Sequence, residues 1–229
     1  MAEEFSSYRI DDIDYKMQQV GWLPLDVMAT GVTGAGKSST LNSLFTKNVA
    51  EVGDGVEPMT METGYYELND VLRIWDTPGL GDGVENDKRH KKKLVELLRK
   101  TYALDGKEYG FVDMVLVIIE GSSRDMGSTY TLLNEVLVPN IQKERILVVI
   151  NQVDIAMKGR HWNQKTGKPD TQLLNFLEEK ALSVQRRVKE ATGVSILKPV
   201  YYSAVYKYNL HAVLDFIIDN IPLHRRKLS

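Results

Sequence analysis

The chain has 229 residues, 43% of them hydrophobic and 26% charged, values typical of one globular domain with a full core. Its net charge of −2 implies no general attraction to nucleic acid or membranes, and the absence of cysteine excludes disulfides and thiolate metal sites. The acidic, polar first residues differ from a signal peptide, and no apolar run approaches the roughly 20 residues of a membrane span. We therefore expect a cytoplasmic protein, with peripheral membrane association left open.

The first expected element is a short helix near the N-terminus. An apolar stripe at helical spacing comprises Ile10, Ile13, Met17 and Val20. Gly21 follows as a helix stop signal, so residues 1–22 form a helical extension that leans on the main domain. At the other end of the chain, the basic residues 223–229 form a tail that we expect to fray.

Six segments predict strands, because they are β-branched or leucine-rich runs or alternate between apolar and polar residues. They are residues 25–31, 64–68, 71–79, 114–120, 146–151 and 198–204. The second and third are joined across Asn69-Asp70, which is typical of a hairpin. Apolar stripes at helical spacing cover residues 94–102, 174–188 and 210–221. This alternation predicts one α/β domain over residues 23–222, with a mostly parallel sheet and helices on both faces.

A long polar stretch, residues 157–170, separates the fifth strand from the helix that follows it. It contains two glycines and a proline, and it is long for a connection in an α/β domain. We expect this stretch to be an exposed insert, with His161 and Trp162 in its exposed tip. The alternative is that these two residues contact a partner.

The segment GVTGAGKSST fits the phosphate-loop pattern G-x-x-x-x-G-K-[ST] through Gly31, Gly36, Lys37 and Ser38. Glycines let backbone N–H groups turn toward phosphates, and the following helix adds its positive end. Lys37 would reach the β- and γ-phosphates, and the Ser38 hydroxyl would ligate Mg²⁺. Further contacts are expected from Thr33, Gly34, Ala35 and Ser39. A chance match is disfavoured by the strand before and the helix after the loop, but the loop alone does not distinguish ATP from GTP.

DTPG, residues 76–79, directly follows the third predicted strand. Asp76 would hold the Mg²⁺ shell through a water, and the Gly79 N–H would meet the γ-phosphate and sense its loss. The alternative is an ordinary turn.

NQVD, residues 151–154, ends the fifth predicted strand and bears on the choice of base. The Asp154 carboxylate can accept hydrogen bonds from the N1–H and the exocyclic amine of guanine, whereas adenine lacks both donors on that edge. Asn151 would tie this loop to the phosphate loop. In YSA, after the last strand, Ser203 lies beside Ala204, whose N–H would reach guanine O6. Each motif alone could be a plain turn, and their order along the chain makes them informative together.

These motifs, with the VEPMT segment, make the chain resemble the translation-factor-related P-loop GTPases, in the branch of Era, the septins and the chloroplast import receptors. Small bacterial YfjP-type GTPases and, in part, immunity-associated GTPases are similar over residues 25–221. The resemblance implies a Ras-like G domain with a six-stranded sheet, and GTP or GDP bound with Mg²⁺ at the carboxyl ends of the strands. It implies that Thr60 ligates Mg²⁺ in the GTP state, with Thr63 as the alternative.

Three positions depart from the family pattern. Gln152 replaces the lysine of N-K-x-D, so stacking over the base loses its charge. Leu80 stands where many switch GTPases carry a glutamine that orients water, and leucine cannot polarise water. Gly34 replaces the asparagine that binds potassium in some relatives. Hydrolysis therefore needs help from elsewhere, and the resemblance suggests Arg124, reaching a partner subunit in a nucleotide-dependent homodimer. The alternative is a surface arginine paired with a neighbouring carboxylate.

The run KRHKKK, residues 88–93, is the densest basic stretch of the chain. It could bind RNA, acidic lipid or a partner, or it could be the solvated start of a helix. Because six cations at a helix N-terminus oppose the helix dipole, we expect a mobile segment in the GDP state.

The combined prediction is a GTP phosphohydrolase with slow intrinsic turnover, raised by dimerisation or by a protein partner. Lys37 and Mg²⁺ would stabilise the transferring phosphoryl charge, while Thr60 and the Gly79 N–H position the γ-phosphate and water. Leu80 leaves open a nucleotide-gated interaction module with little hydrolysis. An ATP-dependent phosphotransferase is a third alternative, which NQVD and YSA disfavour.

Overall fold

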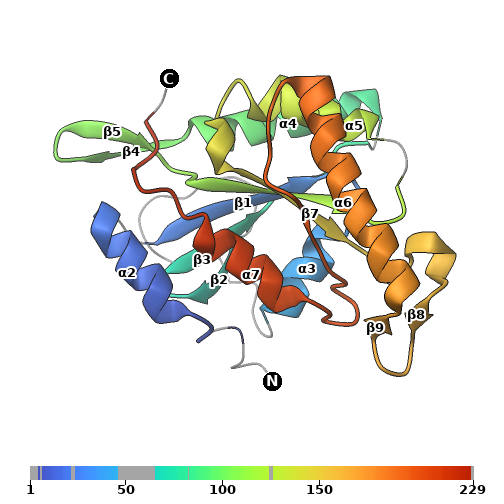
Figure 1. The fold of residues 1–229 in the computed structure, drawn as a ribbon. Coiled ribbons are helices and arrows are strands. Elements are labelled where there is room, and N and C mark those ends of the chain that lie inside the picture. The colour runs from blue at the N-terminus through green and yellow to red at the C-terminus, as the bar shows by residue number, and fades with distance from the viewer. Residues whose placement is uncertain are drawn as a thin grey trace.

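The computed structural model describes residues 5, 7–21, 24–45, 65–81, 83–123 and 126–227. Its centre is a six-stranded sheet in the order β10-β7-β6-β1-β3-β2 (Figure 1). The strands are β1 (Leu25–Gly31), β2 (Tyr65–Asn69), β3 (Leu72–Asp76), β6 (Met114–Glu120), β7 (Ile146–Asn151) and β10 (Val200–Tyr201). Only the hairpin pair β2–β3 is antiparallel among these neighbours. The predicted α/β fold, its hairpin and its mostly parallel sheet are confirmed.

Helices cover both faces of this sheet. They are α2 (Ile10–Val20), α3 (Lys37–Leu44), α4 (Val84–Arg99), α5 (Gly127–Thr131), α6 (Thr171–Thr192) and α7 (Leu210–Asp219). Short helical turns are η1 (Leu132–Leu137), η2 (Lys143–Arg145) and η3 (Ala156–Gly159). None of the described helices combines the length and the apolar character that crossing a bilayer requires.

The sheet separates two hydrophobic cores because successive strand residues face opposite sides. On β6, Leu116 packs in the core that contains Leu214 of α7, whereas Val117 packs in the core that contains Leu177 of α6. Helices α2, α3 and α7 close the first core, and α4, η1 and α6 close the second. Both faces of β6 and β7 are therefore buried, which explains their continuous apolar sequences.

A second hairpin was not predicted from the sequence. Strands β4 (Thr101–Leu104) and β5 (Lys107–Gly110) form an antiparallel pair that extends from the main sheet (Figure 1). The predicted helical stripe ran on to Tyr102, but α4 ends at Arg99 and Tyr102 pairs with Tyr109 across the hairpin. Tyr102 follows Leu98 by four residues, so its position fits the helical spacing although it lies in a strand.

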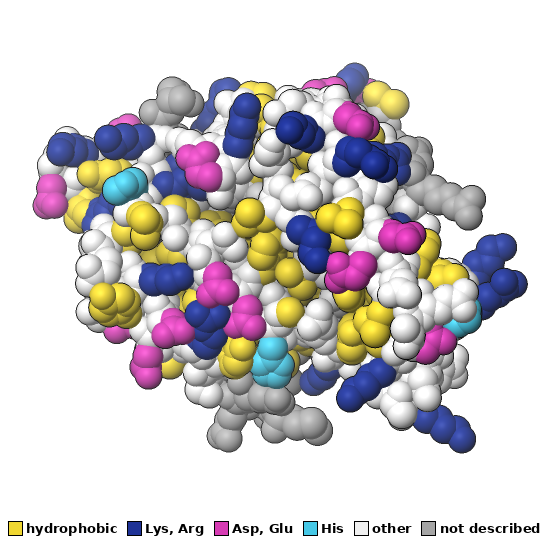
Figure 2. Space-filling view, viewed as in Figure 1, with side chains coloured by type: hydrophobic (Ala, Val, Ile, Leu, Met, Phe, Trp, Pro, Cys, Tyr) yellow, Lys and Arg dark blue, Asp and Glu magenta, His cyan; other side chains and the backbone are white. Residues whose placement is uncertain are grey.

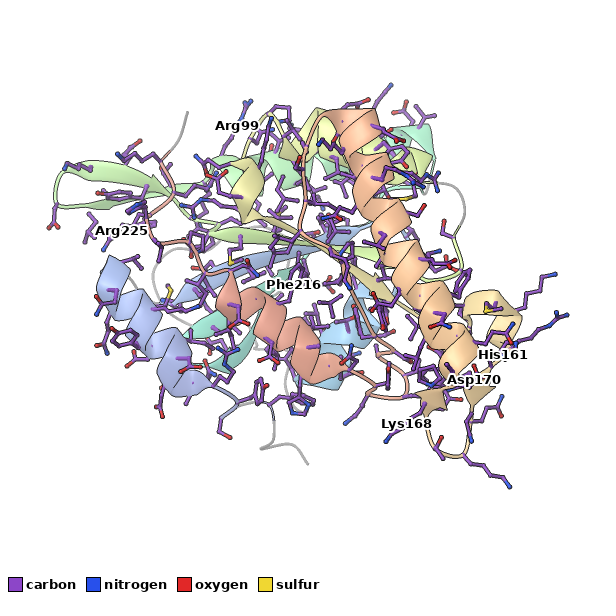
Figure 3. The ribbon with its side chains drawn as sticks, in the orientation of Figure 1. Arg99, His161, Lys168, Asp170, Phe216 and Arg225 are labelled. Atoms are coloured by element: carbon purple, nitrogen blue, oxygen red, sulfur yellow. The ribbon has the colours of Figure 1, made fainter. Side chains whose placement is uncertain are left out.

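The insert at 157–170 is more ordered than expected. It contains the small hairpin β8 (Trp162–Asn163) and β9 (Lys168–Pro169), and His161 Nδ1 lies 2.8 Å from a carboxylate oxygen of Asp170 (Figure 3). The expectation of an exposed tip is wrong for Trp162, which is 8% exposed and packs against Tyr206 and Tyr208. Burying a large aromatic ring anchors the insert to the segment before α7.

The C-terminal segment is also packed, as far as Lys227. Arg226 is 1% exposed, and its guanidinium donates hydrogen bonds to the carbonyl oxygens of Asn140 (3.0 Å) and Leu98. Arg225 lies over the Tyr109 ring and connects the segment to the end of α2 (Figure 3). The predicted fraying is wrong for residues 223–227, because these arginines satisfy backbone carbonyls that the rest of the fold leaves open.

Candidate functional site

The phosphate-loop motif lies between β1, which ends at Gly31, and α3, which begins at Lys37. Gly34 and Gly36 have φ values of 83° and 84°, in the left-handed region that favours glycine. A Cβ at Gly36 would lie 2.3 Å from Asn151 Nδ2, and one at Gly31 would lie 2.2 Å from the Ile118 carbonyl oxygen. The glycines are therefore required both by backbone conformation and by close packing.

Lys37 and Gly79 meet at the mouth of this loop. Lys37 Nζ lies 3.2 Å from the Val32 carbonyl oxygen, so its ammonium group points along the loop. A Cβ at Gly79 would lie 2.6 Å from Lys37 Nζ and 2.7 Å from the Thr33 nitrogen. DTPG thus touches the groups expected to hold the terminal phosphate, and any side chain at Gly79 would displace them.

Ser38 and Asp76 form the candidate metal position. The Ser38 hydroxyl donates to Asp76 Oδ2 at 3.1 Å, while the buried Asp76 Oδ1 has no hydrogen-bond partner among the described residues. Burial raises the pKa of Asp76, opposed by Ser38, Lys37 and the Thr77 N–H. A hydroxyl and a carboxylate with a spare buried oxygen suit Mg²⁺, which would supply its positive charge to phosphate oxygens there. Thr60, the other predicted ligand, and its alternative Thr63 lie outside the described residues.

Three loops meet through Asn151, at the end of β7. Its Nδ2 donates to the Ala35 carbonyl oxygen at 3.0 Å, and its Oδ1 accepts from the Ala204 nitrogen at 3.1 Å. Asn151 therefore joins the phosphate loop to YSA, as well as to its own NQVD turn. Gln152 adds a second link, because its Nε2 donates to the Gly34 carbonyl oxygen at 2.9 Å.

Asp154 lies where the base would be recognised. Its Oδ1 accepts a hydrogen bond from the Ser203 hydroxyl at 2.6 Å, and its side chain is partly exposed. Ser203 orients the carboxylate and leaves it access to solvent, which a base must displace. Ser39 is exposed on the first turn of α3. The predicted site residues within the described part of the chain thus lie on neighbouring loops at one edge of the sheet, whereas Arg124 lies outside the described residues.

Sequence reasoning missed the hydrogen bonds that hold Gly79 and Leu80, the residues at and after the end of DTPG. His90 Nδ1–H donates to the Gly79 carbonyl oxygen at 2.6 Å. The buried Leu80 accepts from the Thr33 N–H at 2.7 Å, and its own N–H donates to the Gly31 carbonyl oxygen at 3.3 Å. These bonds hold the Gly79–Leu80 peptide against the phosphate loop. The spacing of four residues from His90 to Leu94 indicates that His90 shares the apolar face of α4, but it does not indicate that the partner is Gly79.

The same helix corrects the interpretation of the basic run. Helix α4 begins at Val84, with Glu85 and Asp87 in its first turn, so residues 88–93 lie within the helix and not at its start. Negative side chains in the first turn interact favourably with the positive N-terminal end of the helix dipole. The dipole argument for a mobile segment therefore does not apply, although the prediction for the GDP state itself stays untested.

Residues 26–152, more than half of the chain, match the model of a family described as 50S ribosome-binding GTPase. The chain belongs to this GTPase family. Over 213 residues the GTPase is 27% identical to interferon-inducible GTPase 1 of Mus musculus, covering 88% of this chain and 45% of that protein. It spans about half the length of the curated relatives that it matches.

Solved structures share the fold of this GTPase. Toc33 from Arabidopsis thaliana, in complex with Mg²⁺ and GMPPNP, matches with a TM-score of 0.62 at 15% identity, over 99% of this chain and 98% of that one. A GTP-binding protein from Sulfolobus solfataricus, in complex with GDP, matches with a TM-score of 0.54 at 20% identity, over 93% of this chain and 57% of that one. The predicted Ras-like G domain is confirmed.

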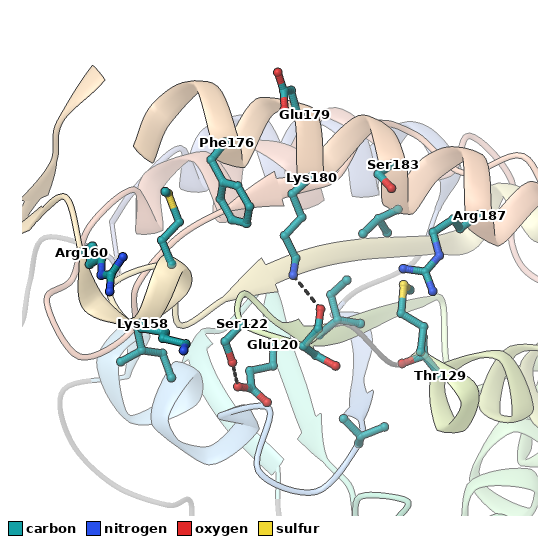
Figure 4. Close-up of a pocket in the computed structure, with 17 residues that line it drawn as sticks. Glu120, Ser122, Thr129, Lys158, Arg160, Phe176, Glu179, Lys180, Ser183 and Arg187 are labelled. Atoms are coloured by element: carbon teal, nitrogen blue, oxygen red, sulfur yellow. Dashed lines mark hydrogen bonds between the residues drawn. The ribbon is translucent and has the colours of Figure 1, made fainter. Parts of the chain in front are cut away.

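A cavity of about 990 Å³ lies beside the phosphate loop of the GTPase and touches that loop at Val32 (Figure 4). Val32 forms part of its wall, and the rest comes from β6, η3, α6 and the segment around α5. We locate the nucleotide site from the converging loops, since the glycine geometry, the Ser38–Asp76 pair and Asp154 all lie there. The cavity is a separate feature of the molecule.

Proposed function

We propose that this GTPase binds GTP and GDP with Mg²⁺ and hydrolyses GTP slowly. The observation that carries the proposal is the convergence of Lys37, the Ser38–Asp76 pair and Asp154 at the carboxyl ends of β1, β3 and β7. Ligands in open α/β sheets bind at this edge. Lys37 suits a phosphate group, the Ser38–Asp76 pair suits a divalent cation, and Asp154 suits the hydrogen-bond donors of guanine.

Each group has a distinct task in the proposed reaction. Lys37 and the N–H groups of the phosphate loop hold the phosphates and stabilise charge on the transferring phosphoryl group. The Gly79 N–H would contact the γ-phosphate, and Thr60, which is outside the described residues, would ligate the metal and help to position the attacking water. Asp154 accepts two hydrogen bonds from guanine, and Asn151 keeps that loop in register with the phosphate loop.

Slow turnover follows from Leu80. This side chain is buried and apolar, so it cannot orient water where many switch GTPases use glutamine. A partner must then raise the rate, and we propose that a second copy of the chain supplies Arg124. If no partner does so, the protein acts as a nucleotide-gated interaction module, the alternative that Leu80 favours.

Base recognition is tested with Asp154→Asn. The variant should lose affinity for GDP by about a hundredfold and gain affinity for xanthosine diphosphate, because the asparagine amide pairs with the xanthine carbonyl. Asp105→Asn, in the turn between β4 and β5, is the matched control and should leave GDP affinity unchanged. Unchanged guanine preference in Asp154→Asn, measured by displacement of a fluorescent guanine nucleotide, would contradict the assignment.

Hydrolysis is tested by single-turnover phosphate release over a range of protein concentrations. A rate that rises with concentration supports stimulation by dimerisation, and Arg124→Ala should abolish that rise. Light scattering with GDP and with a non-hydrolysable GTP analogue measures the dimer directly. A rate that stays near zero at every concentration would favour the interaction module and contradict self-stimulated hydrolysis.

A further inference from the structure

The cavity beside the phosphate loop has the size and the apolar lining of a small-molecule site. Its volume of about 990 Å³ lies at the upper end of the range for such sites. Its apolar part is formed by Ile119, Met126, Ile155, Met157, Phe176 and Val184. Ile155 and Phe176 are 45% and 36% exposed, so the concavity leaves large apolar side chains in water. Apolar surface gathered in a hollow marks a binding site more often than scattered exposure does.

Cations outnumber carboxylates around this apolar surface. Lys158, Arg160, Lys180 and Arg187 line the cavity, against Glu120 and Glu179. Figure 4 shows Glu179 pointing away from the cavity, and Glu120 accepts a hydrogen bond from Ser122. Glu120 keeps its negative charge in that bond, but with four cations against two carboxylates the lining as a whole is positively charged.

Two of the cations are available to a ligand. Lys180 is held in place by donating to the Ser123 carbonyl oxygen at 2.8 Å. By contrast, the side chains of Lys158 and Arg160 form no ion pair or hydrogen bond with other residues in the described part of the chain. Both lie on the η3 side of the cavity, opposite Phe176 of α6 (Figure 4).

The backbone of η3 is strained where it forms this wall. Met157 and Lys158 have φ values of 53° and 63°, consecutive left-handed conformations in residues other than glycine. Each costs roughly 1–2 kcal/mol relative to an ordinary conformation. Such strain persists where surrounding contacts fix it, and it is concentrated at ligand-binding positions. Here it places an apolar and a cationic side chain next to each other on the same cavity.

We propose that this cavity binds a small amphipathic anion, with an acyl or aryl group on Phe176 and Met157 and a phosphate or carboxylate against Lys158 and Arg160. The occupant differs from the nucleotide, because none of the residues predicted to contact the nucleotide lines the cavity. Both a free metabolite and the acyl phosphate of a lipid have this chemistry.

Calorimetry with octyl phosphate below its micellar concentration tests the proposal on the whole chain. Octyl phosphate should bind about tenfold more tightly than octanol, and inorganic phosphate should not compete at the same concentration. Lys158→Glu and Arg160→Glu should each weaken octyl phosphate binding about tenfold, while Lys165→Glu, the same charge change on the β8–β9 turn, leaves it within about twofold. Circular dichroism confirms that each variant is folded.

Lys37→Ala separates this site from the phosphate loop and should leave octyl phosphate binding unchanged. Loss of binding in Lys37→Ala, or equal binding by Lys158→Glu, Arg160→Glu and the unmodified chain, would overturn the proposal. A second arm offers phosphatidylcholine vesicles with and without phosphatidic acid. Sedimentation of the chain only with the acidic vesicles, lost in Lys158→Glu, identifies lipid as the source. Binding of the monomer alone identifies a soluble anion.

Discussion

The two edges of the central sheet, where its strands end and where they begin, both hold charged groups, and they use them differently. At the carboxyl edge, Lys37, Ser38 and Asp76 face one another around positions that a ligand can fill. At the opposite edge lies a basal charge cluster, defined as Asp26, Arg73, Asp113, Arg145 and Arg226. There the Arg73 guanidinium bonds both oxygens of Asp26, at 2.8 and 2.7 Å, and Trp75 Nε1 donates to Asp26 as well.

The difference teaches that a perturbed pKa does not by itself locate a functional site. Burial raises the pKa of Asp113 to about 7, in the basal charge cluster. Yet the Asp113 carboxylate accepts from the Asp26 N–H at 2.9 Å, and Arg145 donates to the Asp113 carbonyl oxygen at 3.0 Å. These partners belong to the fold itself. The carboxyl edge is distinguished by convergent loops and an oxygen without a partner, and not by the largest shift.

Arg226→Ala should give the largest effect and act on stability alone. The change empties a buried position and removes the donors of the Leu98 and Asn140 carbonyl oxygens, so we expect a loss of about 3 kcal/mol in the free energy of unfolding. Urea unfolding measures this loss. Lys227→Ala, on the exposed neighbour, is the control. A large change in GDP affinity of the folded Arg226→Ala variant would contradict the assignment of Arg226 to stability alone.

Lys37→Ala should show the converse, a loss of function without a loss of stability. Removing the ammonium group should weaken GTP binding about a hundredfold, equivalent to about 2.7 kcal/mol. The free energy of unfolding without nucleotide should change by less than about 1 kcal/mol, since the Lys37 ammonium lies beside loop carbonyls and Gly79 and outside the hydrophobic cores. Fluorescent nucleotide titration and urea unfolding together decide this, and equal GTP affinity would contradict the role of Lys37.

Asp113 should make stability depend on pH. Because its folded pKa is raised above the ordinary value of 3.8, its stabilising contribution is complete at low pH and is lost as pH rises through about 7. Between about pH 5 and about pH 8, the unmodified chain should lose about 2 kcal/mol more than Asp113→Asn, whose amide oxygen can still accept from Asp26. Asp26, whose pKa burial also raises, is present in both proteins, so the difference reports the titration of Asp113 together with its coupling to Asp26. The measurement is urea unfolding of both proteins over this pH range. If the free energy of unfolding changes equally with pH in the unmodified chain and in Asp113→Asn, Asp113 does not titrate in this range.

His90→Ala should give the smallest effect, confined to the carboxyl edge. Loss of one hydrogen bond to Gly79 loosens the peptide held against Thr33, so affinity for a GTP analogue should rise about fivefold relative to GDP. His90→Gln can still donate to the carbonyl and should stay nearer the unmodified chain. Lys92→Ala, on the exposed side of the same helix, is the control. Equal shifts for GDP and the analogue would mean that His90 does not act through Gly79.

Much of the fold followed from local patterns. The continuous apolar runs of β6 and β7 and the stripes of α6 and α7 predicted these elements, because burial on two faces or one dictates their periodicity. The phosphate loop, DTPG, NQVD and YSA could likewise be placed on strand ends from sequence. The β4–β5 hairpin, the burial of Trp162 and the packing of Arg226 could not, because each depends on partners far away in the chain.

The sequence by itself determined the chemistry at each position: a glycine loop with Lys37 and Ser38, a carboxylate at Asp76 and another at Asp154. Tertiary structure alone decided which of these groups meet, since Asn151 joins three loops only when β1 and β7 lie in one sheet. It also decided that His90, within a basic run, binds the switch glycine, and that Arg226 is buried. Charge and polarity are local properties of a residue, whereas burial and partnership are properties of the packed chain.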